Sequence, residues 1–285
     1  MQVTIINVYN DIVPEGSEFI ADHGVAFYIE TPEKTILFDT GAKGDILLHN
    51  MKALDLDPDA IETIILSHGH WDHSGGIIGL LKERTKDTPI TVIAHPTIME
   101  LKGIVRKKDN KNILYEFPKI PQSLQKRIIF KYTKEPVSIT EKLATLGEIR
   151  NRPHKDGTEP RLIHEVNGKI EIDSMMDDLS LVLETKNGLV LICGCCHAGL
   201  LNTLSRVSAL YENKNIHTII GGTHMLRFNH EEVDFVAENL KKHYGSPKLF
   251  LNHCTGINTT DHLLTHFNNE ILNICLVGKK FTFEC

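Results

Sequence analysis

Four side chains of metal-binding type lie close together in one short stretch of this chain: His68, His70, Asp72 and His73. Alternate residues of an extended segment point the same way, so His68 and His70 can bind one metal ion. A tight turn after them would bring Asp72 and His73 to an adjacent position, where they can hold a second ion. Imidazole nitrogens with a carboxylate suit zinc, and a mixed site of this kind also accommodates manganese or iron.

The stretch that precedes these residues indicates how they are positioned. Residues 61–66, Ile-Glu-Thr-Ile-Ile-Leu, form an apolar run that predicts a buried strand, and the histidines follow it directly. Proteins of the α/β class place their sites where such strands end. Gly75-Gly76 then leads into an amphipathic pattern at 77–86, which predicts a helix.

The rest of the chain repeats this arrangement of strands followed by helices. Strands are also expected at 2–9, 24–30, 35–39, 90–94, 179–185, 189–193, 216–220, 248–254 and 274–277, and helices at 44–54, 198–211, 231–242 and 261–270. Strands lead into helices twice over, each time starting from a hairpin, which predicts an α/β protein with mixed sheets covered by helices. Residues 103–175 are rich in Lys, Arg, Pro and Asn, so we expect an insertion or extended hairpin region within a single domain of residues 1–285.

Composition indicates which kinds of partner and which cellular location to expect. The 285 residues carry a net charge of −6 and include 16 histidines, and the balance is that of an ordered globular protein. The negative charge argues against a nucleic-acid partner held by backbone electrostatics. The six cysteines all lie in the last third of the chain, which favours reduced thiols in the cytoplasm. No signal peptide or membrane-spanning run is evident, so we expect a soluble cytoplasmic protein.

The segment 67–76 resembles the His-x-His-x-Asp-His signature of metallo-β-lactamase-fold metallohydrolases. The segment 37–41, Leu-Phe-Asp-Thr-Gly, is similar to that family's second marker, which implies that Asp39 supports the metal-binding loop from behind. The resemblance extends over about residues 3–281. It implies a four-layer αββα sandwich with two divalent metal ions, zinc first, at one edge of the sheets.

Four further segments narrow the resemblance to one branch of the family. They are His23-Gly24 and the stretches at 194–199, 221–224 and 252–256. Together they resemble the dihydropterin-ribofuranosylaminobenzene-phosphate synthase-like branch, which is named after a proposed enzyme of methanopterin biosynthesis. The name of this branch leaves the substrate of the present chain open.

The resemblance also implies the remaining metal ligands. His253 ends a late strand and matches the family's last metal-binding histidine. The family's third histidine is absent, and we infer that His197 supplies it. Asp178 lies where that histidine is expected, and it could bind a metal or accept a hydrogen bond behind one.

The family's bridging aspartate is absent as well. Cys195, Cys196 and His197 stand near its usual place, so we expect a water or hydroxide to be the main bridge. Cys195, Cys196 and Cys254 flank ligands, and the default expectation for them is that of small buried residues.

Other polar residues are candidates for contacts with the substrate. His224 follows a strand and could face the substrate, bond the bound water or serve the fold alone, and His23 could approach from the first hairpin. Arg150, Arg152 and His154 belong to a basic cluster that is either a solvated loop or a clamp for a phosphate or carboxylate. The histidines without evident partners are His49, His95, His217, His230, His243, His262 and His266, and we expect them to be incidental.

These features predict a metal-dependent hydrolase of a small molecule with a phosphate, ester or lactam-like bond. Two divalent ions would polarise the substrate and supply hydroxide, with Asp72 orienting the hydroxide and His224 donating to the developing oxyanion. Two alternatives stay open, a pterin-linked synthase and a catalytically inert sensor that binds a small ligand at the metal site. Neither nucleic acid nor a membrane is expected as a partner, and the oligomeric state is left open.

Overall fold

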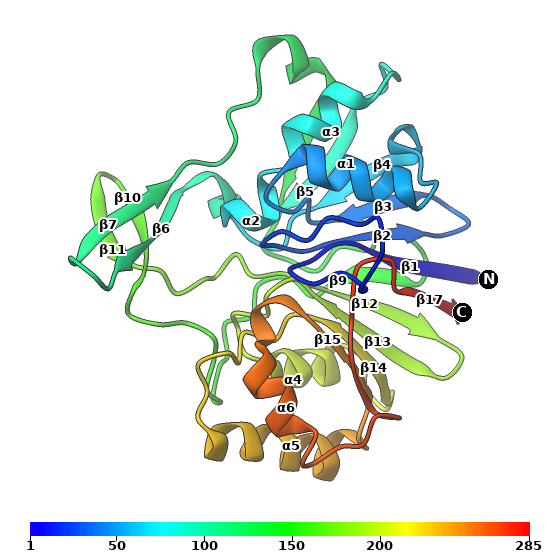
Figure 1. The fold of residues 1–285 in the computed structure, drawn as a ribbon, viewed down its shortest axis with the longest axis vertical. Coiled ribbons are helices and arrows are strands. Elements are labelled where there is room, and N and C mark those ends of the chain that lie inside the picture. The colour runs from blue at the N-terminus through cyan, green and yellow to red at the C-terminus, as the bar shows by residue number, and fades with distance from the viewer.

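The computed structural model describes residues 1–285, which are arranged in four layers. Two sheets stand face to face in the middle of the molecule, and helices cover the outer face of each (Figure 1). This arrangement confirms the αββα sandwich. No helix is both long enough and apolar enough to span a bilayer.

The first sheet has seven strands and ends in a parallel half. In spatial order they are β17 (Lys280–Glu284), β1 (Gln2–Tyr9), β2 (Ala26–Glu30), β3 (Thr35–Phe38), β4 (Ile61–Ile65), β5 (Ile90–Ala94) and β8 (Ile128–Tyr132). The expected hairpin joins β2 to β3, and the strands from β3 to β8 run parallel. Helices α1 (Gly44–Ala53) and α3 (Ile77–Glu83) pack on the outer face through Leu47, Met51 and Leu80.

The second sheet has six strands and, like the first, combines an antiparallel hairpin with a set of parallel strands. In spatial order they are β16 (Leu272–Ile274), β15 (Lys248–Leu251), β14 (Ile216–Gly221), β13 (Gly188–Cys193), β12 (Ser180–Thr185) and β9 (Leu143–Thr145). A hairpin joins β12 to β13, and β13 to β16 run parallel. The outer face is covered by α4 (Leu200–Leu210), α5 (His230–Tyr244) and α6 (Ile257–Leu263).

Alternation along the strands fills the space between the sheets. Successive side chains of a strand point to opposite faces, so Ile64 packs under the helices while Ile65 packs toward the other sheet. Phe27 from the first sheet and Leu181 and Val190 from the second belong to the same buried cluster. The two sheets therefore share one core, and this packing fixes the position of one sheet relative to the other.

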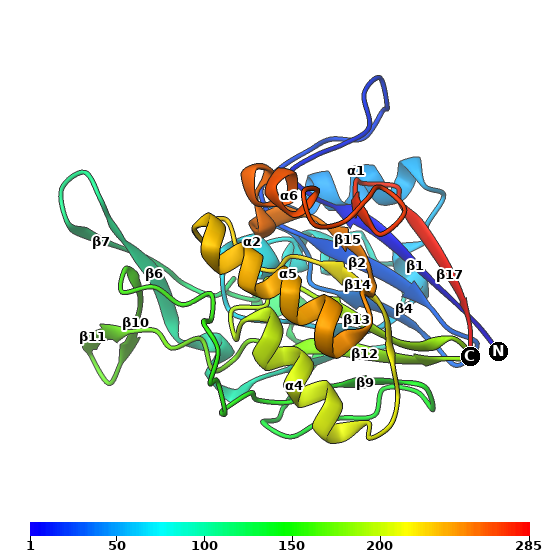
Figure 2. The same cartoon turned by 90° about the horizontal axis from the view of Figure 1, so that it is seen from below.

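The region 103–175 has two roles in the fold. Part of it forms a small separate sheet, which we call the arm, from β6 (Leu101–Arg106), β7 (Lys111–Tyr115), β10 (Leu162–Val166) and β11 (Lys169–Ile172). The arm stands away from the sandwich on the side opposite the chain termini (Figures 1 and 2). The remainder supplies β8 to the first sheet and β9 to the second. Short 3-10 turns lie at η1 (Pro58–Ala60), η2 (Pro96–Met99), η3 (Gln122–Arg127) and η4 (His253–Thr255).

The C-terminal part differs most from expectation. The predicted helix at 261–270 lies earlier, as α6, and the strand predicted at 274–277 is β16 at 272–274. The strand β17 was not predicted, and it pairs with β1 through Val3 opposite Phe283 and Ile5 opposite Phe281. Local patterning cannot reveal such a pairing, because its partner lies at the other end of the chain.

Candidate metal centre

The ends of several strands meet at one edge of the sandwich. The first sheet contributes Asp39 after β3 and the loop after β4, which leads into the one-turn helix α2 (Trp71–Ser74). The second sheet contributes the segments after β13, β14 and β15, which carry His197, His224 and His253. Parallel strands direct their carboxyl ends to a common edge, so residues distant in sequence are brought together here.

Three histidines form the first half of the centre. Nε2 of His68 lies 3.0 Å from Nδ1 of His70, and the ring of His197 is centred 4.8 Å from that of His68. One ring nitrogen from each of the three lies within 4.8 Å of the others. Both ring nitrogens of His197 are buried without a hydrogen-bond partner. Unpaired polar atoms of this kind are rare in folded proteins, and a metal ion held by the three rings would satisfy one of them.

Asp72, His73 and His253 form the second half. Oδ2 of Asp72 lies 3.6 Å from Nε2 of His73 and 3.3 Å from Nε2 of His253. The rings of His73 and His253 are centred 5.3 Å apart. One carboxylate oxygen and two imidazole nitrogens therefore face a common point, a donor set that suits zinc, manganese or iron.

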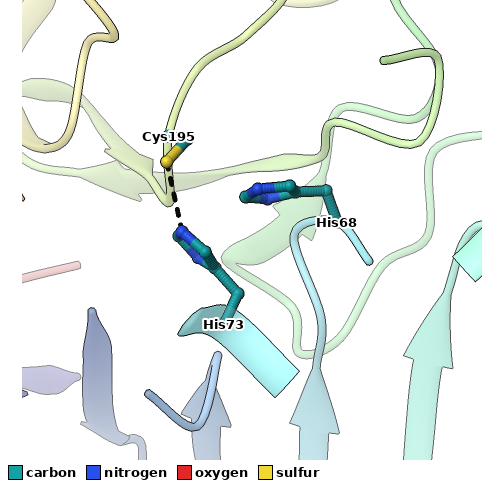
Figure 3. A group of neighbouring side chains, drawn as sticks. All are labelled: His68, His73 and Cys195. Carbon is teal, nitrogen blue, oxygen red and sulfur yellow. Dashed lines mark hydrogen bonds between the residues drawn. The ribbon is translucent and has the colours of Figure 1, made fainter. Parts of the chain in front are cut away.

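The thiol of Cys195 lies between these halves. Its Sγ is 3.1 Å from Nε2 of His73, and both lie beside His68 (Figure 3). The same sulfur also lies within 4.8 Å of ligand-type atoms of His197 and His253. Cys195 is buried, as expected, and its sulfur in addition faces ligand-type atoms. Its place after Gly194, where the family carries its bridging aspartate, was the sequence signal for a further ligand.

The metal-facing rings are held from behind by hydrogen bonds. His73 donates from Nδ1 to Asp39 at 2.7 Å, and His253 donates from Nδ1 to Asp11 at 2.5 Å. Asp39 also accepts from the backbone N–H and the hydroxyl of Ser67, each at 2.7 Å. Carboxylates that accept from the second ring nitrogen fix the orientation of metal-binding histidines. Asp39 thus lies where the resemblance implies, whereas Asp11 was not expected at the site.

The two halves of the chain approach each other closely behind the centre. A Cβ atom on Gly194 would lie 2.4 Å from Oγ of Ser67 and 2.7 Å from Oδ2 of Asp39, so glycine alone fits there.

Asp39, His224 and His253 adopt left-handed backbone conformations, with φ of 60°, 47° and 45°. Such conformations cost about 1–3 kcal/mol each and cluster at functional sites.

A buried lysine, which the sequence analysis did not single out, supports the metal-binding loop from the arm. Nζ of Lys102 on β6 lies 2.6 Å from Asp173 and 3.0 Å from Asp177, and Lys102 is only 1% exposed. Asp177 also accepts a hydrogen bond of 2.8 Å from the backbone N–H of Gly69, between His68 and His70. The network therefore joins the arm to the loop that carries the first two histidines.

Burial sets the protonation of the first half. Burial and the neighbouring imidazoles hold the pKa of His68 and of His197 well below the usual value for histidine, and burial lowers that of His70 to about 4. These rings are therefore neutral at pH 7, the form that binds metals. Burial by itself would raise the pKa of Asp72, but His73 and His253 hold it well below its usual range.

Three other predicted residues lie at or near the centre. The ring of His224 is centred 4.0 Å from that of His197, and its Nδ1 is buried without a partner. His23 places Nε2 3.3 Å from Oδ2 of Asp72. Asp178 accepts from the backbone N–H of Ala198 at 2.9 Å, which places it behind His197, and burial raises its pKa to about 6.

The predicted basic cluster lies elsewhere. Arg150 pairs with Glu148, and Arg152 donates to backbone carbonyls, including those of Ser174 and Met175. Neither these arginines nor His154 line the cavity at the metal centre. The structure does not bring these side chains to the candidate centre, because Arg150 and Arg152 are each bonded to a neighbouring group.

A cavity of about 430 Å³ opens onto the centre. His23, His70, Asp72, Cys195, His197, His224 and His253 line its polar side, and Trp71, Ile104, Tyr115, Leu162 and Leu226 line an apolar side. The rings of Trp71 and Tyr115 are centred 6.1 Å apart, and both are about one-third exposed. The arm supplies Ile104, Tyr115 and Leu162. The arginine at this cavity is Arg227, which pairs with Glu159.

Comparisons with known proteins place the fold and the sequence in a family. The chain is 29% identical, over 94% of its length and 92% of the relative, to the 7,8-dihydropterin-6-methyl-4-(β-D-ribofuranosyl)-aminobenzene-5'-phosphate synthase of Methanocaldococcus jannaschii. The crystal structure of Tm1679, described as a metal-dependent hydrolase of the β-lactamase superfamily, matches with a TM-score of 0.81, 25% identity and 98% coverage of both chains. The fold protein YhfI from Bacillus subtilis matches with a TM-score of 0.57 at 13% identity, over 99% of both chains, which shows the fold alone. A family model for the metallo-beta-lactamase superfamily matches residues 20–195, and the chain therefore belongs to that superfamily.

Proposed function

We propose that this protein is a metal-dependent hydrolase of a phosphorylated or ester-containing small molecule. The observation that carries the proposal is the convergence of imidazoles, a carboxylate and a thiol on one cavity, from the loops after β4, β13, β14 and β15 and from the segment before β2. The unpartnered ring nitrogens of buried His197 support metal binding in particular.

Two ions would be held by separate groups of residues. His68, His70 and His197 would hold one, and Asp72, His73 and His253 the other, with Cys195 between them. When bound, such ions polarise the substrate and make a water molecule acidic enough to attack near neutral pH.

The chain's own residues would then position the reacting groups. Oδ2 of Asp72 is held within 3.3 Å of Nε2 of both His23 and His253, so its direction is fixed and it can accept a hydrogen bond from the attacking water. Nδ1 of His224 has no partner in the protein and can donate to the oxygen that gains charge. The apolar wall of the cavity would exclude bulk water from one side.

A pterin-linked synthase is the second candidate, and two observations favour it. The chain matches a named synthase over nearly its whole length. In addition, Trp71 and Tyr115 present exposed aromatic rings at the mouth of the metal centre, where a flat ring system could stack. The name of the relative contains a pterin and a phosphorylated ribosyl-aminobenzene. The pterin and the aminobenzene are flat, and the phosphate is anionic.

The test is turnover of bis(p-nitrophenyl) phosphate and p-nitrophenyl phosphate by protein loaded with zinc or manganese. We expect metal-dependent hydrolysis by the wild type. In H197Q the rate should fall at least roughly 10–100-fold, which is the typical cost of losing a residue that only supports a metal ligand. The variant H217Q changes a histidine on β14 outside the cavity and should keep full activity.

Absence of hydrolysis with every metal would overturn the hydrolase proposal. In that case a rise in the unfolding temperature with a dihydropterin or an aryl ribose phosphate would favour the synthase, since ligands specific for the native state stabilise it.

A further inference from the structure

Three histidines that we expected to be incidental gather on the outer helical layer. His262 lies on α6, His266 follows one helical turn later, and His230 is the first residue of α5. None of them lines the cavity at the metal centre. His262 and His266 share a neighbour, Asp234, which lies on α5.

The side chains converge on a single atom. Nε2 of His262 lies 2.7 Å from Oδ1 of Asp234, and Nε2 of His266 lies 2.6 Å from the same oxygen. His262 lies near the end of α6 and His266 in the turn that follows it, and both present a ring nitrogen to the same point. Here the neighbouring helix directs a carboxylate toward both of them.

The surroundings hold this arrangement in place while leaving it accessible. The ring of His230 stacks on that of His262 with centroids 4.0 Å apart and planes 9° apart, which restrains the orientation of His262. The side chains of His262 and His266 are each 19% exposed and that of Asp234 is 39% exposed, so an ion can reach them. A cavity of about 620 Å³ opens beside His230 and His262.

We propose that Asp234, His262 and His266 form a second, peripheral site for a divalent transition-metal ion such as zinc. Two imidazoles, one carboxylate and a water complete the four-coordinate geometry that zinc prefers. Ligand atoms around zinc lie roughly 3.3 Å apart, so the present hydrogen-bond distances need to open by about 0.6 Å, a small shift for partly exposed side chains. The bound ion joins α5 to α6 and stabilises this layer.

Only one carboxylate oxygen of Asp234 is engaged by the two imidazoles. Oδ2 of Asp234 makes no hydrogen bond within the protein, which leaves a second oxygen for the ion.

The test is the number of zinc ions bound per chain, measured by elemental analysis after dialysis of the full-length protein against zinc. We expect H262Q/H266Q and D234N each to bind one ion fewer than the wild type. H243Q alters an exposed histidine on the same helix and should bind as many as the wild type. In H68Q/H73Q, which alters the main centre, the peripheral ion should remain.

A second readout guards against misfolding. Hydrolytic or ligand-binding properties at the main centre should be unchanged in H262Q/H266Q, while the rise in unfolding temperature on adding zinc should be smaller than in the wild type. Equal zinc content in the wild type and in both altered proteins would overturn the proposal, as would an ion fewer in H243Q.

Discussion

The thiol of Cys195 faces imidazoles from both halves of the metal centre. Its surroundings therefore differ from those of an ordinary buried cysteine. A buried cysteine ordinarily behaves as a small apolar side chain. Here its Sγ lies 3.1 Å from Nε2 of His73, and both atoms lie within 4.8 Å of a ring nitrogen of His68. We therefore expect Cys195 to bind metal as a thiolate, in the place where the family carries an aspartate.

Cobalt substitution tests this role at the residue itself. The cobalt-loaded wild type should show the near-ultraviolet charge-transfer absorption of a thiolate bound to cobalt, and C195S should lack it. C275S removes another buried thiol, one that does not line the cavity, and should keep the absorption. The same absorption in C195S would show that Cys195 is not a ligand.

The residues of the centre could be predicted where the signal is local. The stretch from His68 to His73 carries four candidate ligands in sequence order, and the family resemblance implied that Asp39 supports this loop, where it bonds His73. Asp11 and Lys102 could not be found this way. Each reaches the site through a contact over a long sequence separation, and nothing next to either residue in the sequence indicates it.

At the scale of elements, the arm is tied to the metal-binding loop through Lys102. In K102M, the carboxylates of Asp173 and Asp177 would stay buried without their cation. Removing one partner of a buried ion pair typically costs about 3–5 kcal/mol, so we expect a loss of this order in the free energy of unfolding. K108M alters an exposed lysine of the same arm and should be near neutral. Denaturant unfolding measures both, and equal stabilities would contradict the role.

The effect of Lys102 should also depend on pH. Burial opposes ionisation of Asp173, but Lys102 outweighs it and holds the pKa of Asp173 below its usual value. A carboxyl group with a lowered pKa stabilises the fold above its unfolded-state pKa, and this contribution is lost as the pH falls through the folded-state value. The difference in stability between the wild type and K102M should therefore be largest near neutral pH and shrink below about pH 4. A constant difference would indicate that packing, rather than charge, is lost.

The elements near the site followed from sequence because their patterns are strong and local. The apolar run before His68 forms β4 over Ile61–Ile65, and the hairpin β2–β3 lies as expected. The arm and β17 depend on pairings between distant segments, so composition indicated only that residues 103–175 are different. The predicted position of α6 was wrong by several residues at each end.

At the scale of the whole molecule, the proposed metal ligands come from both halves of the sandwich. His68, His70 and His73 come from the first sheet's loops, whereas His197 and His253 come from the second's. Each ion would thus bind groups from both halves, and Cys195 opposite His73 would reinforce the link. Removing metal should weaken the contact between the halves as well as abolish activity.

Chelation tests this link through global stability. Treatment with a chelator should lower the unfolding temperature of the wild type, because ions bound only by the native state stabilise it. Adding zinc should restore it. H197Q, which lacks a ligand from the second half, should show a much smaller response, and an identical response would argue that the ions do not bridge the halves.

We expect two metal ions at the shared edge of the sheets. Anomalous diffraction from crystals of the zinc-loaded protein tests this expectation most directly. We predict two anomalous peaks within this cavity, one among His68, His70 and His197 and the other among Asp72, His73 and His253. A cavity with no peak, or with one peak that contacts neither set, would contradict the account.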